Sequence, residues 1–168
     1  MSAKTENLVS TLSLQPVVPV IVIEDARHAV PLARALVAGG LKAIEITLRT
    51  AAALDAIKAV AEEVEGAVAG AGTVLDARQW DLAVKAGSKF IVSPGSCNSV
   101  LDAADASDIP LLPGAVTATE VMMLRDRGYS VLKFFPAEQA GGASYINALS
   151  SPLAGIRFCP TGGVSLKN

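Results

Sequence analysis

A lysine interrupts one of the most apolar runs of this 168-residue chain. In VLKFFPAE, residues 131–138, Lys133 stands between two aliphatic and two aromatic side chains, a pattern typical of a buried strand. A buried ammonium group is costly unless it is paired, neutralised or used, although a lysine at a strand end can extend its charge to water. The chemistry that uses a half-buried lysine is imine formation with a carbonyl substrate, in which the neutral amine is the nucleophile.

Three further residues have side chains suited to that chemistry. Glu45 and Arg49 lie four residues apart in AIEITLR (43–49), and Thr73 ends the segment GAGT (70–73). A carboxylate near a substrate hydroxyl acts as a general acid or base, directly or through a water. A guanidinium binds a substrate carboxylate through two parallel hydrogen bonds. The alternative for the first two residues is an ion pair with each other on one strand face.

A glycine-bearing turn, PTGG (160–163), follows the last strand-like run of the chain. In barrels of parallel strands, the loops after the seventh and eighth strands frequently hold phosphate with backbone N–H groups. Thr161, Gly162 and Gly163 are therefore candidate phosphate ligands, and a tight turn without a ligand is the alternative. GAGT is a weaker signal, because such a segment often only lets a helix pack closely.

The elements that must position these residues follow a regular alternation. Strand-like runs recur every 20–26 residues, at 17–23, 43–49, 67–74, 90–95, 110–116, 131–137 and 156–163. Helical runs lie between them, at 25–40, 50–64, 76–88 and 117–128, and another helix is expected at about 4–13. This spacing predicts parallel βαβ units within one domain, 1–168, forming either a barrel or a doubly wound sheet.

The run AIEITLR favours the barrel. Its residues alternate, with Ile44, Ile46 and Leu48 on one face and Glu45, Thr47 and Arg49 on the other. A central strand of an open sheet is covered by helices on both faces and is apolar throughout. In a barrel, the polar face points into the interior, and strand ends at the C-terminal rim build the active site. Glu45, Arg49, Thr73 and Lys133 are then expected to converge.

The composition excludes several classes of protein. Hydrophobic residues make up 51% of the chain and the net charge is -2, which does not indicate a nucleic-acid or anionic-membrane partner. Cys97 and Cys159 lie far apart and are expected to be reduced packing thiols. His28 is the only histidine, which argues against a histidine-ligated metal site. Without a leader or a long apolar span, the chain is expected to be cytoplasmic.

Most of the chain, from about residue 16 to 165, carries a series of motifs in a fixed order: PVVPVIV, EITLRT, GAGTVL, SPG, PLLPGAVTATE, KFFPAE and FCPTGG. Together they resemble the 2-keto-3-deoxy-6-phosphogluconate aldolases, a family that also acts on 4-hydroxy-2-oxoglutarate. The resemblance implies a (β/α)8 TIM barrel, a homotrimer, and a class I aldolase that releases pyruvate. It also implies an enzyme of carbohydrate metabolism, in the Entner–Doudoroff pathway, with a 2-keto acid substrate and no metal or other cofactor.

The resemblance also implies a role for each matched residue. Lys133 of KFFPAE is the Schiff-base lysine, and Glu45 of EITLRT is the acid/base. Arg49 and Thr73 hold the carboxylate at the pyruvate end of the substrate and its surroundings. The remaining implied site residues are Pro94 and Phe135, which wall the pocket, and Thr161, Gly162 and Gly163, which form part of a phosphate cradle.

The chain departs from the family after its seventh strand. The family continues with a helix, an eighth strand bearing a Gly-Gly-Ser phosphate loop, and closing helices, whereas this sequence ends at Asn168. We therefore expect a TIM barrel truncated after strand seven. The alternatives are a working aldolase, a catalytically impaired truncated barrel, or another phosphate-binding barrel enzyme such as an epimerase. Lys133 argues against the last, and a shortened phosphate site is expected to penalise the phosphorylated substrate more.

Overall fold

A computed structural model of the protein describes residues 3–168. Its strands are β1 (Val20–Ile21), β2 (Ala43–Thr47), β3 (Val68–Gly72), β4 (Phe90–Val92), β5 (Leu111–Leu112), β6 (Val131–Phe134) and β7 (Arg157–Pro160). Each strand lies within one of the seven runs expected from the sequence and ends before that run does. The C-terminal residues of the runs form loops instead, and the candidate residues Arg49, Thr73, Pro94 and Phe135 all lie in these loops.

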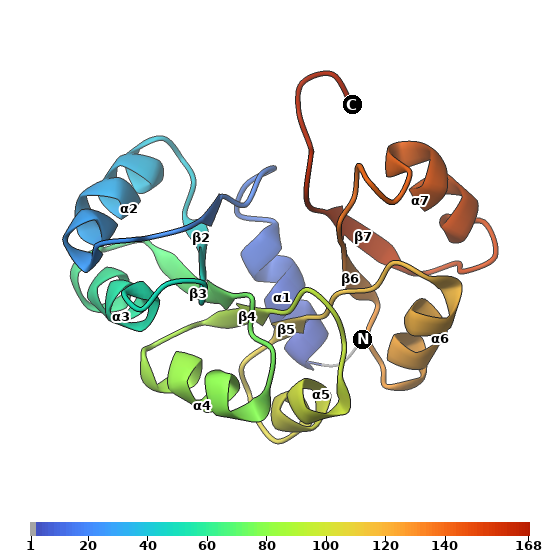
Figure 1. The fold of residues 1–168 in the computed structure, drawn as a ribbon, viewed down its shortest axis with the longest axis horizontal. Coiled ribbons are helices and arrows are strands. Elements are labelled where there is room, and N and C mark those ends of the chain that lie inside the picture. Colours follow the sequence, from blue (N-terminus) through green and yellow to red (C-terminus); the bar gives the residue numbers. More distant parts are fainter. Residues whose placement is uncertain (1–2) are drawn as a thin grey trace.

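Helices separate the strands and surround them. They are α1 (Ala3–Leu12), the short 3-10 helix η1 (Ala26–His28), α2 (Ala29–Ala38), α3 (Ala53–Glu63), α4 (Ala77–Lys85), α5 (Asn98–Asp105), α6 (Ala118–Asp126) and α7 (Gly142–Ser150). A capping box is present at the start of α6: the Glu120 N–H donates to Thr117 Oγ1, and the Thr117 N–H donates to Glu120 Oε2. Figure 1 shows α2 to α7 around the outside, with α1 nearer the centre.

The strands form one parallel, curved arrangement in chain order. The first five make a continuous sheet, and β6 pairs with β7. A bridge between Gly114 and Lys133 joins the two parts. There the Lys133 N–H donates to the carbonyl oxygen of Pro113 at 2.8 Å, and the Ala115 N–H donates to that of Lys133 at 2.9 Å. These bonds hold the backbone of Lys133 against the loop after β5.

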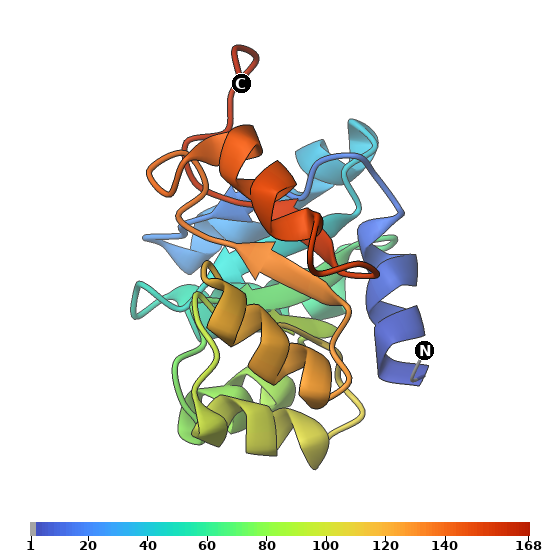
Figure 2. The ribbon, with the colours of Figure 1, turned by 90° about the vertical axis from the view of Figure 1, so that its right-hand side faces the viewer.

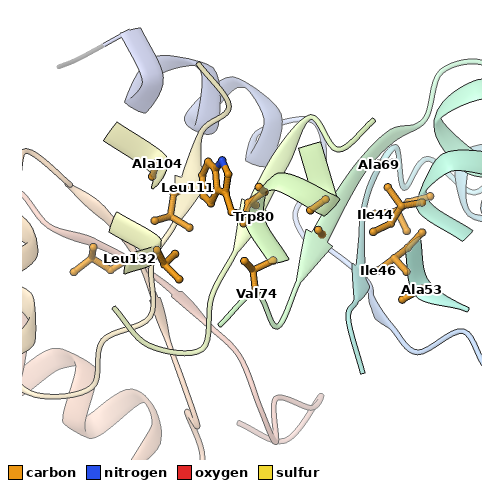
Figure 3. Packing of buried hydrophobic residues seen from close by; sticks show 14 of the residues in the cluster. Ile44, Ile46, Ala53, Ala69, Val74, Trp80, Ala104, Leu111 and Leu132 are labelled. Carbon is orange, nitrogen blue, oxygen red and sulfur yellow. The ribbon is translucent and has the colours of Figure 1, made fainter. Parts of the chain in front are cut away.

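The main hydrophobic core lies between the strands and the outer helices. It contains Ile44 and Ile46 of β2, Ala69 of β3 and Leu132 of β6, packed with helix residues such as Trp80 of α4 (Figure 3). The Trp80 side chain is only 2% exposed. The outward face of β2 is thus the Ile44 and Ile46 face, as the alternation in AIEITLR predicts, and its other face turns inward.

A second, smaller core fills the interior near the N-terminal ends of the strands. Its buried members come from α1 and from the inward positions of four strands: Leu8, Ala43, Phe90, Val92, Leu112 and Val131. Figure 2 shows α1 at one end of the strands, away from α6 and α7. Gln15, just after α1, donates to the carbonyl oxygen of Ala43 and accepts from the N–H groups of Lys42 and Ala43. This helix therefore covers the barrel floor.

The barrel formed by the described residues is open on one side. β1 and β7 are the two outer strands of the arrangement, and neither pairs with the other. A cavity of about 400 Å³ opens between them, bordered by β1 and by the turn after β7. Seven parallel strands with surrounding helices and one open seam agree with the expected TIM barrel truncated after strand seven. None of the helices in residues 3–168 is both long and apolar enough to cross a membrane.

Candidate active site

A buried ion pair occupies the upper interior of the barrel. Lys133 Nζ of β6 lies 3.3 Å from Glu45 Oε1 of β2 and donates a hydrogen bond to it. Their side chains are 6% and 4% exposed, respectively. Both residues point inward because they occupy alternate positions of strands whose other face packs against the helices. The lysine in the apolar run of residues 131–138 is therefore buried and paired, and does not extend to solvent.

The environment of Glu45 suits a group that exchanges a proton. Burial raises the pKa of this carboxyl above its ordinary value, while the positive charges of Lys133 and Arg49 oppose the change. A carboxyl group whose pKa moves toward neutrality takes up and returns protons more readily near pH 7. Ion pairing with Arg49, the alternative left open by the sequence, is not the observed arrangement, since the partner of Glu45 is Lys133.

An aromatic ring forms the wall beside the lysine. Phe135 follows β6, and its ring centroid lies 5.5 Å from Lys133 Nζ, within range of a cation–π contact. The ring is 38% exposed and packs near Gly162, where an added Cβ would lie 3.4 Å from two ring carbons. Phe135 thus links the lysine to the turn after β7.

Arg49 and Thr73 lie in the loops after β2 and β3. Arg49 is exposed, and its Nε donates to Thr47 Oγ1 at 3.1 Å, while that hydroxyl donates to the carbonyl oxygen of Ile21. Thr73 is half-buried and adopts φ 59°, a left-handed conformation that is unfavourable for a β-branched residue. Such strain persists only where the surroundings impose it, and it concentrates at functional sites.

Pro94 and the PTGG turn occupy the same rim. Pro94 is half-buried after β4, and the chain there passes so close to Gly114 that a Cβ at Gly114 would lie 2.6 Å from Gly95 N. In the turn after β7, Gly162 and Gly163 have φ of 97° and 74°. The carbonyl oxygens of Thr161 and Gly162 accept from the N–H groups of Ala137 and Glu138, so this turn is bonded to the loop that follows Lys133.

The cavity between β1 and β7 brings several of these groups together. Glu45, Thr161, Gly162 and Gly163 line it, together with apolar side chains of the barrel interior and of the β1 segment: Leu12, Val18, Val20, Phe90, Val92 and Leu112. A carboxylate at one wall and a glycine turn at another are polar groups converging on a largely apolar cavity, which is the usual make-up of a small-molecule site.

Cys159 was not singled out for the site by its sequence, yet it borders this cavity too. It is the β7 residue in register with Lys133. Burial raises the pKa of its thiol, as does the charge of Glu45. The alternation of residues along β7 indicates that the Cys159 side chain points inward. The sequence gives no further signal, because the same pattern fits a cysteine that packs in a core and one that borders a site.

Metal-binding groups do not gather in the described part of the chain. No cluster of three or more His, Cys, Asp or Glu side chains with the geometry to hold a metal ion occurs among those residues. The polar centre of the barrel includes one ammonium and one carboxylate, which are groups for acid–base and imine chemistry.

Comparison with known proteins assigns this arrangement to a family. Residues 8–168 match the family model for KDPG and KHG aldolase. The KHG/KDPG aldolase of Escherichia coli strain K12 is 50% identical over 159 residues, which are 95% of this chain and 75% of that protein. A 2-dehydro-3-deoxy-phosphogluconate aldolase of Pseudoalteromonas atlantica is 52% identical over 153 residues, or 91% of this chain and 71% of that one.

Solved structures agree with the sequence relatives. The 2-keto-3-deoxy-6-phosphogluconate aldolase of Zymomonas mobilis ZM4, determined with 3-phosphoglycerate, superimposes with a TM-score of 0.93 at 48% identity, covering 96% of this chain and 77% of that chain. The KDPG aldolase of Legionella pneumophila gives 0.91 at 42% identity, with 95% and 77% coverage. That crystal holds pyruvate as a covalent carbinolamine intermediate.

Proposed function

This chain belongs to the KDPG and KHG aldolase family, and on that basis we propose that it is a class I aldolase acting through an imine on Lys133. Its substrate is 2-keto-3-deoxy-6-phosphogluconate, cleaved to pyruvate and glyceraldehyde 3-phosphate, and it also cleaves 4-hydroxy-2-oxoglutarate to pyruvate and glyoxylate. The observation that carries the proposal is the buried pair in which Lys133 Nζ lies 3.3 Å from Glu45 Oε1.

The first chemical step is addition of the Lys133 amine to the keto carbon C2. A proton passes to the former carbonyl oxygen, which gives a carbinolamine, and loss of water then gives an iminium ion. The short contact supports this step because Glu45 can accept a proton from Nζ before the attack. The carbinolamine held in the Legionella pneumophila neighbour is the corresponding species with pyruvate.

The second step breaks the C3–C4 bond. Glu45, through a water, removes the proton of the C4 hydroxyl, and the electrons of the breaking bond pass to the iminium nitrogen, which gives an enamine. The aldehyde leaves, C3 of the enamine takes up a proton, and hydrolysis of the imine releases pyruvate and restores the amine. The raised pKa of Glu45 supports its role as the group that holds this proton near neutral pH.

Binding groups surround this pair at the C-terminal rim. Arg49 and Thr73 hold the carboxylate beside the keto group, since a guanidinium is suited to bidentate carboxylate binding. The pocket walls and the phosphate-binding turn complete the proposal, with Pro94 and Phe135 as walls and Thr161, Gly162 and Gly163 as phosphate ligands. The contact of Phe135 with both Lys133 and Gly162 supports a continuous site from the imine to the phosphate.

The alternative of a catalytically impaired barrel is not favoured, since the relatives at about 50% identity are aldolases; its outcome can be stated from the open seam. β1 and β7 do not pair, and the site cavity opens between them. Under this alternative the phosphorylated substrate is penalised more than 4-hydroxy-2-oxoglutarate.

Pyruvate release from each of the two substrates tests the proposal and separates the two candidates. A working aldolase releases pyruvate from both, and Lys133→Met abolishes the release. Similar kcat/KM values for the two substrates, with only a small decrease for the phosphorylated one, would support a usable phosphate cradle. No release from either substrate, in a chain that unfolds cooperatively, would support the impaired barrel.

The quaternary structure and cellular location belong to the same proposal. We propose a homotrimer without a metal or cofactor, as the family resemblance implies, located in the cytoplasm. Sedimentation equilibrium measures the mass of the assembly directly, and a mass of three chains is the expected result. Dialysis against a chelator is expected to leave pyruvate release unchanged, because the imine itself accepts the electrons of the breaking bond.

A further inference from the structure

Gly72, the last residue of β3, lies directly beneath the carboxylate of Glu45. A Cβ built on Gly72 would fall within 2.6 Å of Glu45 Cγ and 2.7 Å of Glu45 Cδ, and closer still to Oε1. Such distances are far inside van der Waals contact. The carboxylate therefore occupies the volume that any side chain at position 72 would need.

The backbone does not explain this glycine. Gly162 and Gly163 have positive φ, which disfavours other residues, but Gly72 does not. A glycine within a strand also weakens that strand, because it costs chain entropy and supplies no side chain to pack. What requires glycine at position 72 is space, and the group that takes the space is Glu45.

The position of this space determines where Glu45 points. In the sheet, Glu45 is in register with Gly70, and Thr47 with Gly72, so the Glu45 side chain leans along β3 toward the C-terminal rim. In that direction it reaches 3.3 Å from Lys133 Nζ. A methyl group on residue 72 would push the carboxylate away from this path, and Glu45 is only 3% exposed, so it has little room to retreat.

We infer that Gly72 is a positioning residue: by having no side chain, it lets the Glu45 carboxylate lie across β3 within reach of the Lys133 amine. The inference rests on the proposed function, in which Glu45 moves protons for the imine chemistry. In this inference Gly72 acts through the geometry of Glu45, the side chain that a Cβ at position 72 would meet.

A matched control lies two residues earlier on the same strand. Gly70 is also buried without a positive φ, but a Cβ there would come within 2.5 Å of the Phe90 ring, and its three nearest atoms would all belong to that ring instead of to Glu45. Gly70→Ala therefore overpacks the barrel floor, whereas Gly72→Ala displaces the carboxylate. Both replacements add one methyl group to the same strand. Comparing the two variants therefore separates a loss of stability from a displacement of the Glu45 carboxylate.

The first experiment compares kcat and KM for pyruvate release by Gly72→Ala, Gly70→Ala and Glu45→Gln. The inference predicts that Gly72→Ala lowers kcat by on the order of 10²-fold, approaching the loss in Glu45→Gln, with KM changed less than about 3-fold. Gly70→Ala is expected to lower the melting temperature while kcat falls less than about 5-fold. A kcat for Gly72→Ala equal to that of Gly70→Ala would overturn the inference.

The second experiment keeps the test decisive even when Gly72→Ala fails to fold. Glu45→Ala removes the group that the new methyl would meet, so Gly72→Ala is expected to change neither the melting temperature nor the rate of borohydride trapping with pyruvate in that background. In the parent chain the same substitution is expected to lower both. Equal effects in the two backgrounds would show that position 72 acts independently of Glu45 and would overturn the inference.

These results also separate the inference from the function on which it rests. Full kcat in Glu45→Gln would remove the proposed acid/base role, and with it any catalytic consequence of Gly72. A large kcat loss in Glu45→Gln, together with an unaffected Gly72→Ala, would leave the proposed function intact and overturn the positioning role alone.

Discussion

Two layers of the barrel interior lie two residues apart along the same strands and differ in polarity. In the lower layer, Ala43 of β2 and Val131 of β6 pack with Phe90 beneath the cover of α1. Two residues further on, the inward positions hold Glu45 and Lys133, paired at 3.3 Å. The lower layer resembles an ordinary hydrophobic core, while the upper one buries two ionisable groups at a cost in desolvation free energy.

This difference indicates where the fold is stabilised and where it is adapted for chemistry. Apolar burial near the N-terminal ends of the strands stabilises the barrel, as does the packing of the outer helices. The charged layer sits at the C-terminal ends, next to loops that are less constrained by the core. Substitutions that make the upper layer as apolar as the lower one should therefore lower the activity and raise the stability.

The largest effect is expected when the upper layer is made apolar. The double variant Glu45→Met/Lys133→Met replaces the ion pair with side chains of similar length, which should abolish pyruvate release and raise the free energy of unfolding by about 1–4 kcal/mol. Urea unfolding and a pyruvate assay measure the two outcomes. A double variant that is less stable than the parent chain would show that the charged pair stabilises the barrel.

Single removal of the lysine sharpens this prediction through its pH dependence. In Lys133→Met the carboxyl of Glu45 stays buried without its cation, and burial already raises its pKa. A raised pKa means that stability is full at low pH, where the carboxyl is protonated, and is lost as the pH rises through the pKa of the folded state. Lys133→Met should therefore lose more stability at pH 8 than at pH 5, and an equal loss at both would contradict the buried carboxylate.

A smaller effect on activity is expected from Glu45→Gln. The amide keeps the shape of the side chain above Gly72 but cannot take a proton, so kcat should fall by about 10²–10⁴-fold. In the parent chain the rate should fall at acid pH as Glu45 is protonated, and this acid limb should lie above the range of an ordinary glutamate because burial raises the pKa. If the residual activity of Glu45→Gln no longer falls at acid pH, the assignment of this acid limb to Glu45 is supported.

The lower layer has its own test. Phe90 is fully buried at the barrel floor, and Phe90→Ala should lower the free energy of unfolding by about 3–5 kcal/mol, because it removes a large side chain and leaves a cavity. Where the variant remains folded at low temperature, its kcat should fall far less than that of Glu45→Gln, because Phe90 lines the cavity with an apolar ring and transfers no proton. A kcat loss as large as that of Glu45→Gln would mean that the two layers do not act separately.

The smallest effect is expected at the rim. Arg49→Lys keeps the positive charge but loses the bidentate geometry, so KM for the keto acid should rise by about 10-fold, or roughly 1.4 kcal/mol, with kcat nearly unchanged. Arg49→Met should in addition move the acid limb to higher pH, since the charge of Arg49 lowers the pKa of Glu45. An unmoved limb in Arg49→Met would exclude Arg49 from the electrostatics of the site.

Much of this arrangement could be predicted from sequence because its signals are local. The alternation in AIEITLR correctly separated the helix-facing Ile44 and Ile46 from the inward Glu45, and the helical run predicted at 117–128 contains α6. Helices α5 and α7 were not singled out. Both are short, and α7 begins at a glycine with no side-chain cap, so neither carries a strong local start signal.

Contacts between distant strands were beyond the reach of the sequence pattern. The pairing of Lys133 with Glu45, instead of exposure to water, depends on the curvature of the barrel. The residue pattern of a single strand does not determine that curvature. The fit of Glu45 over Gly72 is likewise a contact between side chain and backbone on two strands. A glycine in a strand signals only that some group approaches closely, without naming which.

Borohydride reduction in the presence of pyruvate, followed by intact mass measurement and peptide mapping, tests the central claim most directly. An amine that forms an imine is trapped as a stable secondary amine, and the adduct is expected on Lys133 alone. Lys133→Met should give no adduct under the same conditions. A folded chain that gives no adduct, or one that carries it on another lysine, would contradict the proposal that the buried lysine of β6 is the nucleophile.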